Sequence, residues 1–217
     1  MVIFLAICIL KSNKQLGPNF ILTPERYNPK RRMNIDSDEA ILLSEIIELS
    51  NDIITIKQGK GKHIIQINTS DAMGGYLNTN SEVTDSINSN KKILKKGDVI
   101  ISRLRPYLRQ VAYVDTEREE VLGASTEFFV LRSRNEESIA YLVPFLLSQP
   151  AQQVFENSVE GSQHPRFKEE DILNLQIPMS IYSDRENISK RVIVAIENYR
   201  KYESSIYNEI FEMNKAM

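Results

Sequence analysis

The chain has 217 residues, of which 41% are hydrophobic and 26% are charged. This balance is typical of a globular protein and excludes a chain that is disordered throughout. The formal net charge of −2 argues against a protein that binds nucleic acid over its whole surface. The length allows one large domain, or one domain with an appendage.

The small net charge hides an uneven distribution along the chain. Residues 57–112 include 10 basic and 4 acidic side chains, whereas residues 113–217 include 11 basic and 18 acidic ones. Positive charge gathered in one segment is typical of a nucleic-acid footprint, and an acidic remainder limits stray binding. The basic segment is therefore where a nucleic-acid contact is expected.

Cysteine and histidine are scarce in this sequence. Because Cys8, His63 and His164 are the only residues of the two types, neither a disulfide framework nor a Cys/His zinc site with four ligands can form. This usage fits the reducing cytoplasm, and we expect no metal and no cofactor.

The chain begins with an apolar run, residues 1–10. The run is too short to cross a bilayer, which needs about 20 apolar residues. It also lacks the basic start and the small-residue cleavage site of a signal peptide. We interpret it as a buried strand or helix, or as the remnant of a longer chain cut at Met1. With the linker-like stretch that follows, it forms an N-terminal segment, residues 1–37.

Residues 38–48 are predicted to form a short amphipathic helix. Apolar side chains recur there at helical spacing behind an acidic first turn, which suits the helix dipole. These side chains are Ile41, Leu42, Ile46 and Leu49. Residues 53–57 then alternate as a strand.

The turn at residues 58–62 is the first candidate for phosphate binding. Gly59 and Gly61 allow the backbone to approach a ligand closely, and lysines suit a phosphate, although the spacing is not that of a P-loop. The alternative is a mobile basic turn in solvent. The candidate side chains are Lys57, Lys60 and Lys62.

Residues 63–68 are predicted to form another strand. Gln66 and Asn68 lie two residues apart and therefore face the same side of it. Their amides match the hydrogen-bonding edge of adenine, but a strand amide more often pairs with neighbouring backbone, and both interpretations stay open. Residues 78–90 are polar and predict a surface loop.

The chain is organised around residues 94–132, which contain three apolar runs bounded by turn formers. Each run is rich in β-branched or aromatic residues and predicts a strand. The runs are residues 99–101, 111–114 and 128–131. The tight turn Lys96-Gly97-Asp98 leads into the first run.

Three arginines lie between the first two of these strands. Arg103, Arg105 and Arg109 flank Pro106 and Tyr107, and no acidic residue interrupts them. Guanidinium groups held on a rigid sheet edge suit a phosphate backbone or the edge of guanine. The alternative is a solvated basic hairpin.

Residues 137–149 predict a mostly apolar helix that resumes at residues 151–157. Pro144 is expected to kink or divide it, because proline lacks an N–H donor and crowds the preceding turn. Three shorter elements follow, a polar loop at residues 161–166, a helical turn at residues 168–173 and a strand at residues 175–178.

The character of the chain changes at Ser183, which forms a capping box with Glu186 and predicts the start of a helix. Apolar residues then recur at steps of three and four without Gly or Pro, over about 45 Å of helix. A stripe of that length cannot be buried wholly on a domain of this size, so we predict a coiled-coil or partner-binding helix. The alternative is a helix folded back on its own domain. The predicted partner contacts are Ile188, Val192, Ile196, Tyr199, Ile206, Ile210 and Met213.

Three stretches resemble the target-recognition domain of a type I restriction–modification specificity (S) subunit. Residues 95–103 are similar to the family's Gly-Asp turn followed by an apolar strand with a basic end. The helix after Ser183 is similar to its spacer helix, and the similarity as a whole covers about residues 42–217. The residues that resemble its closing loop and strand are Gly161, Ser162, Gln163, Arg166, Glu170, Asp171, Ile172, Ile177 and Pro178.

The resemblance implies an α+β fold of mixed type. A recognition domain with a twisted, largely antiparallel sheet and short helices would occupy residues 38–182, and a long coiled-coil-type helix residues 183–217. The implied partners are double-stranded DNA, whose major groove the loops enter, and adenine methyltransferase subunits docked on the helix. The restriction subunit would be reached through the complex, and no membrane is involved.

The chain departs from the family in length. A full S subunit carries two recognition domains and two spacer helices, whereas this chain has room for one of each. A half subunit could rebuild the pair by homodimerising through its helix, which would favour a two-part palindromic site. Two alternatives are the C-terminal recognition domain of a fused methyltransferase–specificity protein, and an interaction module that occupies the methyltransferase without reading DNA.

Signatures of catalysis are missing from the sequence. Asn28-Pro29 is followed by Lys30, so the Asn-Pro-Pro-aromatic loop of an adenine methyltransferase is lacking, and no Asp-x-Lys or Glu-x-Lys of a common metal-dependent nuclease occurs. Neither histidine accompanies a nucleophile elbow. We therefore expect a non-catalytic subunit.

The predicted DNA contacts fall into three groups. Lys57, Lys60, Lys62, Lys95 and Lys96 are expected to hold the backbone. Arg103, Arg105, Arg109, Gln163 and Arg166 are expected at base edges or in a groove. The weaker candidates are Gln66, Asn68, Tyr107 and His164.

Overall fold

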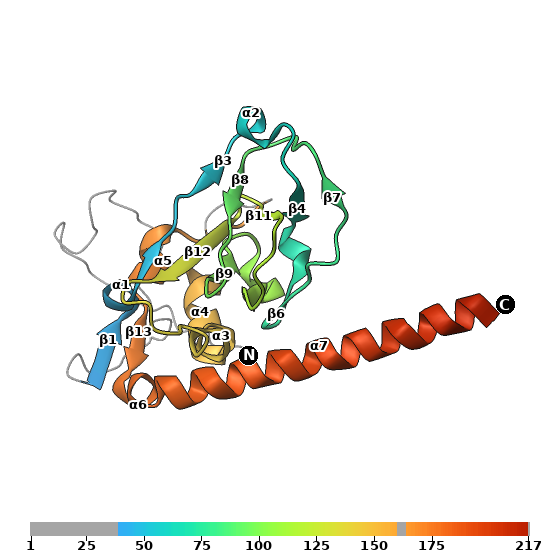
Figure 1. The fold of residues 1–217 in the computed structure, drawn as a ribbon. Coiled ribbons are helices and arrows are strands. Elements are labelled where there is room, and N and C mark those ends of the chain that lie inside the picture. Colours follow the sequence, from blue (N-terminus) through green and yellow to red (C-terminus); the bar gives the residue numbers. More distant parts are fainter. Residues whose placement is uncertain (1–38, 160–163, 217) are drawn as a thin grey trace, which may run out of the picture.

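The computed structural model describes residues 39–159 and 164–216. Within these ranges the predicted fold class is confirmed, because an α+β domain with mainly antiparallel sheets and short helices is followed by one long helix, α7 (Arg185–Ala216) (Figure 1). The N-terminal segment at residues 1–37 and the loop residue Gln163 lie outside the described residues.

Two larger sheets form the centre of the domain. A four-stranded antiparallel sheet has the order β10-β9-β12-β2, and a five-stranded sheet has the order β3-β8-β11-β4-β7 with one parallel pair, β11 and β4. Two further antiparallel pairs are β1-β13 and β5-β6. The strands are β1 (Ala40–Leu42), β2 (Ile47–Leu49), β3 (Ile53–Ile54), β4 (Ile64–Ile67), β5 (Ala72–Met73), β6 (Tyr76–Leu77), β7 (Val83–Thr84), β8 (Lys91–Ile93), β9 (Val99–Ser102), β10 (Val111–Tyr113), β11 (Val121–Ala124), β12 (Phe128–Ser133) and β13 (Gln176–Pro178).

The four-stranded sheet is buried on both faces. Val99 and Ile101 of β9 join a core formed with the helices, whereas Ile100 between them joins a second core formed with the five-stranded sheet. A strand covered on both sides must be apolar at every position instead of alternating. This is why the three apolar runs of the sequence predicted β9, β10 and β12 correctly.

The helix predicted at residues 38–48 is wrong. The segment forms β1, a single helical turn α1 (Leu43–Ile46) and β2. β1 pairs with β13 and β2 pairs with β12, so the partners of both strands lie far along the chain. Pairing at that distance overrides a local apolar spacing that fits a helix.

The neighbouring elements agree with the sequence in part. The strand predicted at residues 53–57 is limited to β3, because Thr55 and Gln58 cap a helical turn, α2 (Ile56–Gly59). The strand predicted at residues 63–68 is confirmed as β4. The loop at residues 78–90 contains the short edge strand β7, which pairs with β4.

Pro144 does not divide the helix in which it lies. It is the third residue of α3 (Leu142–Leu147), in the first turn, where an N–H has no partner within the helix. The interruption falls instead at Ser148, whose backbone is extended, and Pro150 follows in the first turn of α4 (Gln149–Ser158). The predicted helical turn and strand after residue 167 are confirmed as α5 (Glu169–Leu173) and β13.

The long helix begins two residues later than the predicted capping box. Ser183 ends a separate short helix, α6 (Met179–Ser183), and Asp184 precedes the first residue of α7. The carboxylate of Asp184 accepts a 2.7 Å hydrogen bond from the side chain of Asn187, within the first turn.

The first half of α7 packs on the domain and the second half projects beyond it (Figure 1). Ile196 is only 6% exposed, and Ile188 and Val192 pack against the same core. These three residues therefore pack on the chain's own domain, which matches, for this half of α7, the alternative of a helix folded back on its own domain. Further along, Ile206 and Met213 are 45% and 64% exposed. No helix in the described ranges combines the length and apolar character needed to cross a bilayer.

Candidate nucleic-acid interface

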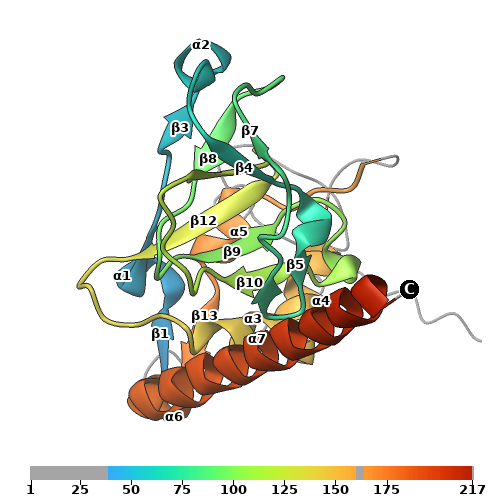
Figure 2. The same ribbon diagram turned by 45° about the vertical axis from the view of Figure 1, so that its right-hand side comes forward.

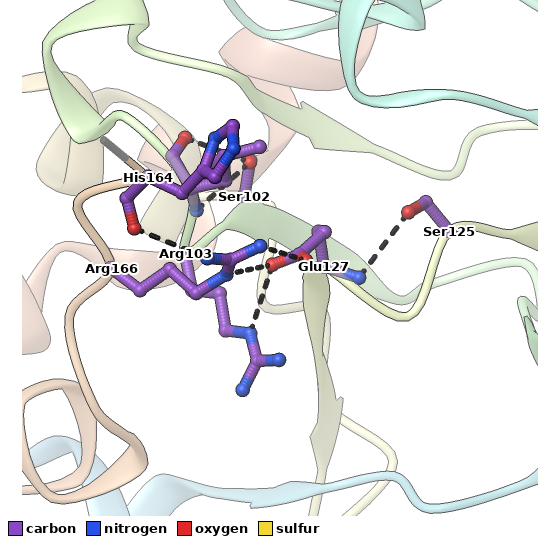
Figure 3. A network of polar contacts seen from close by, with 7 residues as sticks. Ser102, Arg103, Ser125, Glu127, His164 and Arg166 are labelled. Carbon is purple, nitrogen blue, oxygen red and sulfur yellow. Dashed lines mark hydrogen bonds and ion pairs between the residues drawn. The ribbon is translucent and has the colours of Figure 1, made fainter. Parts of the chain in front are cut away.

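One carboxylate joins two arginines at the end of β9. Arg103 follows β9, Glu127 precedes β12, and Arg166 lies in the loop before α5. Both Glu127 oxygens accept hydrogen bonds from Arg166, at 2.8 Å from Nε and 2.7 Å from Nη2, and Arg103 Nε donates to Oε2 at 3.2 Å (Figure 3). Arg166 first, and then Arg103, lowers the pKa of Glu127. We call these three residues the arginine cluster, which has two positive charges and one negative charge.

Backbone pairing brings the members of the arginine cluster together. The register of β9 and β12 places Ser102 opposite Phe128, and the Arg103 N–H donates to the carbonyl of Glu127 at 2.9 Å. Leu104 and Arg166 form an antiparallel bridge. The loop around Arg166 therefore lies beside residues 103–105 as an added strand would, about sixty residues away in sequence.

Arg103 keeps an edge available for a ligand. It bonds Glu127 only through Nε, and Figure 3 shows its two terminal nitrogens directed away from the carboxylate. Two parallel N–H donors of this kind match the O6 and N7 acceptors of guanine, or two oxygens of a phosphate. Beside it lies a pocket of about 400 Å³, lined by Arg103, Phe129, Arg166, Phe167, Lys168, Glu169 and Glu170.

The structure adds a third cation that the sequence did not identify. Lys92 of β8 lies with Nζ 5.7 Å from the ring centre of Phe129, and the guanidinium carbon of Arg103 lies 6.0 Å from the same ring. Burial first, and then the charge of Arg103, lowers the pKa of Lys92. Only the pairing of β8 with β11 and β3 places Lys92 here, and no local pattern encodes that pairing.

Arg105 and Arg109 enclose a short helical turn, η6 (Pro106–Leu108). Both arginines have left-handed backbones, with φ of 51° and 52°. Pro106 is buried, whereas Tyr107 and Leu108 at the apex are 56% and 50% exposed. Within residues 39–159 and 164–216, no acidic side chain contacts either guanidinium. We call residues 105–109 the arginine turn.

Lys95 and Lys96 lie away from the arginine cluster. They precede β9 while Arg103 follows it, a separation of about 20 Å at 3.3 Å per residue. Lys95 Nζ lies 3.1 Å from Asp52. The structure therefore does not bring these two lysines to the arginines at the other end of the strand.

The Gly-Asp turn before β9 has a structural role. Asp98 is 1% exposed and accepts a hydrogen bond from the backbone N–H of Lys95 at 2.8 Å. Its two oxygens bind Nε and Nη2 of Arg132, each at 2.8 Å, and Nη1 of Arg132 binds Asp52 at 2.8 Å. Asp98 is the main cause of a raised Arg132 pKa, and Arg132 is the main cause of a lowered Asp52 pKa.

The lysines in and after α2 form a separate basic tip. Helix α2 lies at the end of the domain farthest from α7 in both views (Figures 1 and 2). Lys57 lies in α2, Lys60 and Lys62 follow it directly, and all three are exposed. The structure therefore presents them on a different part of the surface from the arginine turn, and a single ligand reaches both only if it is long.

The weaker candidates have different surroundings. The amide nitrogen of Gln66 donates to the hydroxyl of Thr84 on β7 at 3.2 Å, so this side chain is used within the sheet. Asn68 is exposed. His164 is exposed next to the arginine cluster, and its carbonyl accepts a hydrogen bond from Arg166 at 3.1 Å.

Arg200 anchors α7 to the domain, and no pattern in the sequence identified it. Arg200 donates to both oxygens of Asp115, at 2.6 and 2.7 Å, to the hydroxyl of Tyr76 at 2.7 Å and to the carbonyl of Leu77 at 3.0 Å. The ring of Tyr199 packs 4.4 Å from that of Tyr76. Tyr199 therefore contacts its own domain on one side, although 46% of it is exposed.

Comparisons with known proteins agree with this architecture. The sequence matches no protein-family model and no curated protein. A solved structure described as the structural basis of complex assembly and conformational transition of the type I R-M system is similar with a TM-score of 0.56 and 19% identity, over 78% of this chain and 45% of that one. The HsdS subunit from Thermoanaerobacter tengcongensis is similar with a TM-score of 0.50 and 17% identity, over 81% of this chain and 45% of that one.

The resemblance to an S-subunit recognition domain is thus confirmed for the fold. The chain spans less than half the length of either structure. Similarity at less than 20% identity shows that the fold is shared, but it does not show that the activity or the partners are shared. Among the described residues, no group of three or more His, Cys, Asp or Glu side chains is arranged to hold a metal ion.

Proposed function

We propose that this chain is a DNA-reading specificity subunit of a type I restriction–modification system, which directs a partner adenine methyltransferase and restriction nuclease to their site. The observation that carries the proposal is that Arg103, Arg105, Arg109 and Arg166 lie near one end of β9, where Glu127 binds Arg103 and Arg166 but neither Arg105 nor Arg109. Glu169 and Glu170 line the adjoining pocket, and the four arginines still outnumber these three carboxylates. An excess of guanidinium over carboxylate is what a polyanion requires.

The arginine cluster is suited to reading a base, and the arginine turn to holding the backbone. Glu127 fixes Arg103 and Arg166 side by side, so little conformational entropy is lost when Arg103 meets a guanine edge. Arg105 and Arg109 have no acidic partner in the described ranges and are available to phosphates. Lys57, Lys60 and Lys62 would contact a more distant part of the same duplex.

The projecting half of α7 is the proposed docking surface for other chains. Tyr202, Ile206, Ile210 and Met213 are exposed at helical spacing beyond the Arg200 anchor. A second copy packed here would give a homodimer with two recognition domains and a palindromic site. The same surface also fits a fused methyltransferase–specificity protein, or a module that occupies the methyltransferase without reading DNA, and DNA binding separates the last of these from the first two.

The test of DNA reading is selection from a random-sequence duplex pool with the full chain, followed by a salt titration of the selected duplex. We expect one motif to be enriched, and affinity to fall steeply between 50 and 200 mM salt because each neutralised phosphate releases counterions. A Lys190→Ala/Lys201→Ala double variant removes two exposed charges from α7 and serves as the matched control. No enrichment and no salt-dependent binding would leave only the interaction module.

The test of the docking surface is the oligomeric state by light scattering. Ile206→Glu/Ile210→Glu should convert a dimer to a monomer, because both side chains are exposed on the projecting half of α7. Ser205→Glu/Asn208→Glu introduces the same charges on the same exposed turns and is the control. A monomeric wild-type chain would exclude the homodimer.

A further inference from the structure

The backbone conformation of the arginine turn is unfavourable for the residues that adopt it. A left-handed backbone is unfavourable for residues with a Cβ and is normally taken by glycine, yet Arg105 and Arg109 both adopt it. A turn that served only to connect β9 with β10 would have no use for two cations at these positions. Sparsely populated backbone conformations of this kind gather at binding sites.

The arginine turn is held rigidly. The N–H of Arg105 donates to the carbonyl of Pro165 at 2.9 Å, that of Leu108 to Arg105 at 2.9 Å, and that of Arg109 to Pro106 at 2.8 Å. Pro106 is buried, and η6 contacts α4. The exposure of the apex therefore comes from the fold itself and not from loose packing.

The apex of the arginine turn combines two features that suit a nucleic acid, whose bases stack and whose phosphates are negatively charged. Tyr107 and Leu108 are exposed side by side, and a cation without an acidic partner in the described ranges flanks each of them. Aromatic rings stack on bases, and apolar side chains next to arginines enter base steps where the flanking phosphates can be bound. The charge of the arginine cluster beside the turn favours the same ligand over a protein groove.

We propose that the arginine turn inserts Tyr107 and Leu108 between two neighbouring base pairs of a bound duplex, while Arg105 and Arg109 bind the phosphates on either side. Insertion unstacks that step and bends the duplex. Flexible pyrimidine–purine steps are then favoured at this position without any hydrogen bond to a base. The inference rests on the proposed function, because it requires duplex DNA on this face.

The experiment uses the full chain and the duplex selected from the random pool. 2-Aminopurine replaces each adenine in turn, and fluorophores at the two ends report bending by energy transfer. We expect the fluorescence of 2-aminopurine to rise at one step and the ends to approach. Tyr107→Ala/Leu108→Ala should remove both signals and weaken binding about tenfold, since base–aromatic stacking is of that order. Tyr107→Phe retains the ring and should retain both signals.

Each outcome decides between the two proposals. Salt-dependent binding without unstacking, or unstacking that survives Tyr107→Ala/Leu108→Ala, overturns the insertion and leaves the proposed function intact. Absence of duplex binding by the wild-type chain overturns both. If the double variant loses capture of a methyltransferase subunit but keeps duplex binding, the apex is a protein contact and the insertion is wrong. Because both side chains are exposed, melting temperatures equal to wild type are expected to confirm that the variants fold.

Discussion

Arg132 and Arg103 both lie at the end of central strands and both bind carboxylates, but they differ in how much acid surrounds them. Arg132 uses Nε and both terminal nitrogens on Asp98 and Asp52. Arg103 uses only Nε and shares Glu127 with Arg166. An arginine whose donors are satisfied within the chain stabilises the fold, whereas one that shares its carboxylate keeps donors and charge for a ligand.

The largest predicted effect is a loss of stability when the ion pairs of Arg132 are broken. Asp98→Ala removes both oxygens that bind Nε and Nη2 of Arg132 and the acceptor of the Lys95 N–H, and it leaves a mostly buried cation with only the half-exposed Asp52 as its acidic partner. We expect a loss of about 3–5 kcal/mol in the free energy of unfolding, measured by urea denaturation. Glu212→Ala breaks an exposed pair with Lys215 and should cost less than about 1 kcal/mol. Equal effects of the two changes would contradict the structural role of Asp98.

Replacing Arg103, which shares Glu127 with Arg166, should affect DNA binding more than stability. Arg103→Ala leaves Glu127 bound by Arg166, so the free energy of unfolding should change by less than about 1 kcal/mol. Affinity for the selected duplex should fall by about 1–3 kcal/mol, and specificity should relax at one base pair. Isothermal titration against duplexes substituted at each position measures both. A large loss of stability with unchanged specificity would show that Arg103, like Arg132, stabilises the fold and does not read a base.

Replacing Glu127 tests whether this residue acts through its negative charge or by positioning the two arginines of the arginine cluster. In Glu127→Gln the negative charge is gone and the two guanidiniums are held less firmly. Affinity for a scrambled duplex should stay the same or rise, whereas the preference for the selected duplex should fall about tenfold, since a well-placed bidentate contact carries 1–3 kcal/mol of discrimination. Competition between the two duplexes gives this ratio, and an unchanged ratio would show that Glu127 does not position the arginines.

The smallest effect is on the dependence of stability on pH. The folded-state pKa values of Asp52 and Glu127 are lowered by their arginines. A depressed carboxyl pKa contributes stability that is present above the unfolded pKa and is lost as pH falls through the folded one. The free energy of unfolding should therefore decline below about pH 4, and Glu127→Gln should decline less than wild type. Denaturation at a series of pH values checks this, and identical pH curves for the two proteins would count against the ion pairs.

The sequence predicted the parts of the fold whose burial is uniform. β9, β10 and β12 are apolar throughout because both faces of their sheet are covered, and this signal is local. The segment of β1, α1 and β2 was predicted incorrectly, because its strands pair with β13 and β12 from far along the chain. The exposed second half of α7 was also predictable, but the anchoring of its first half through Arg200 was not.

The candidate site was predictable as a set of residue types but not as a set of contacts. The arginines of residues 103–109 were evident from the sequence because no acid lies among them. Glu127 and Lys92 were missed, since strand register alone brings them to Arg103. The same register explains why Lys95 and Lys96, close in sequence, lie at the other end of β9.

The most direct test of the account is the salt dependence of binding by an Arg105→Ala/Arg109→Ala variant, measured by fluorescence anisotropy of the selected duplex. We predict that a plot of log affinity against log salt is steep for wild type and that its slope is shallower by about 2 for the variant, because two phosphate contacts are lost. Equal slopes for the two proteins, or binding by neither, would contradict the claim that this end of β9 holds duplex DNA.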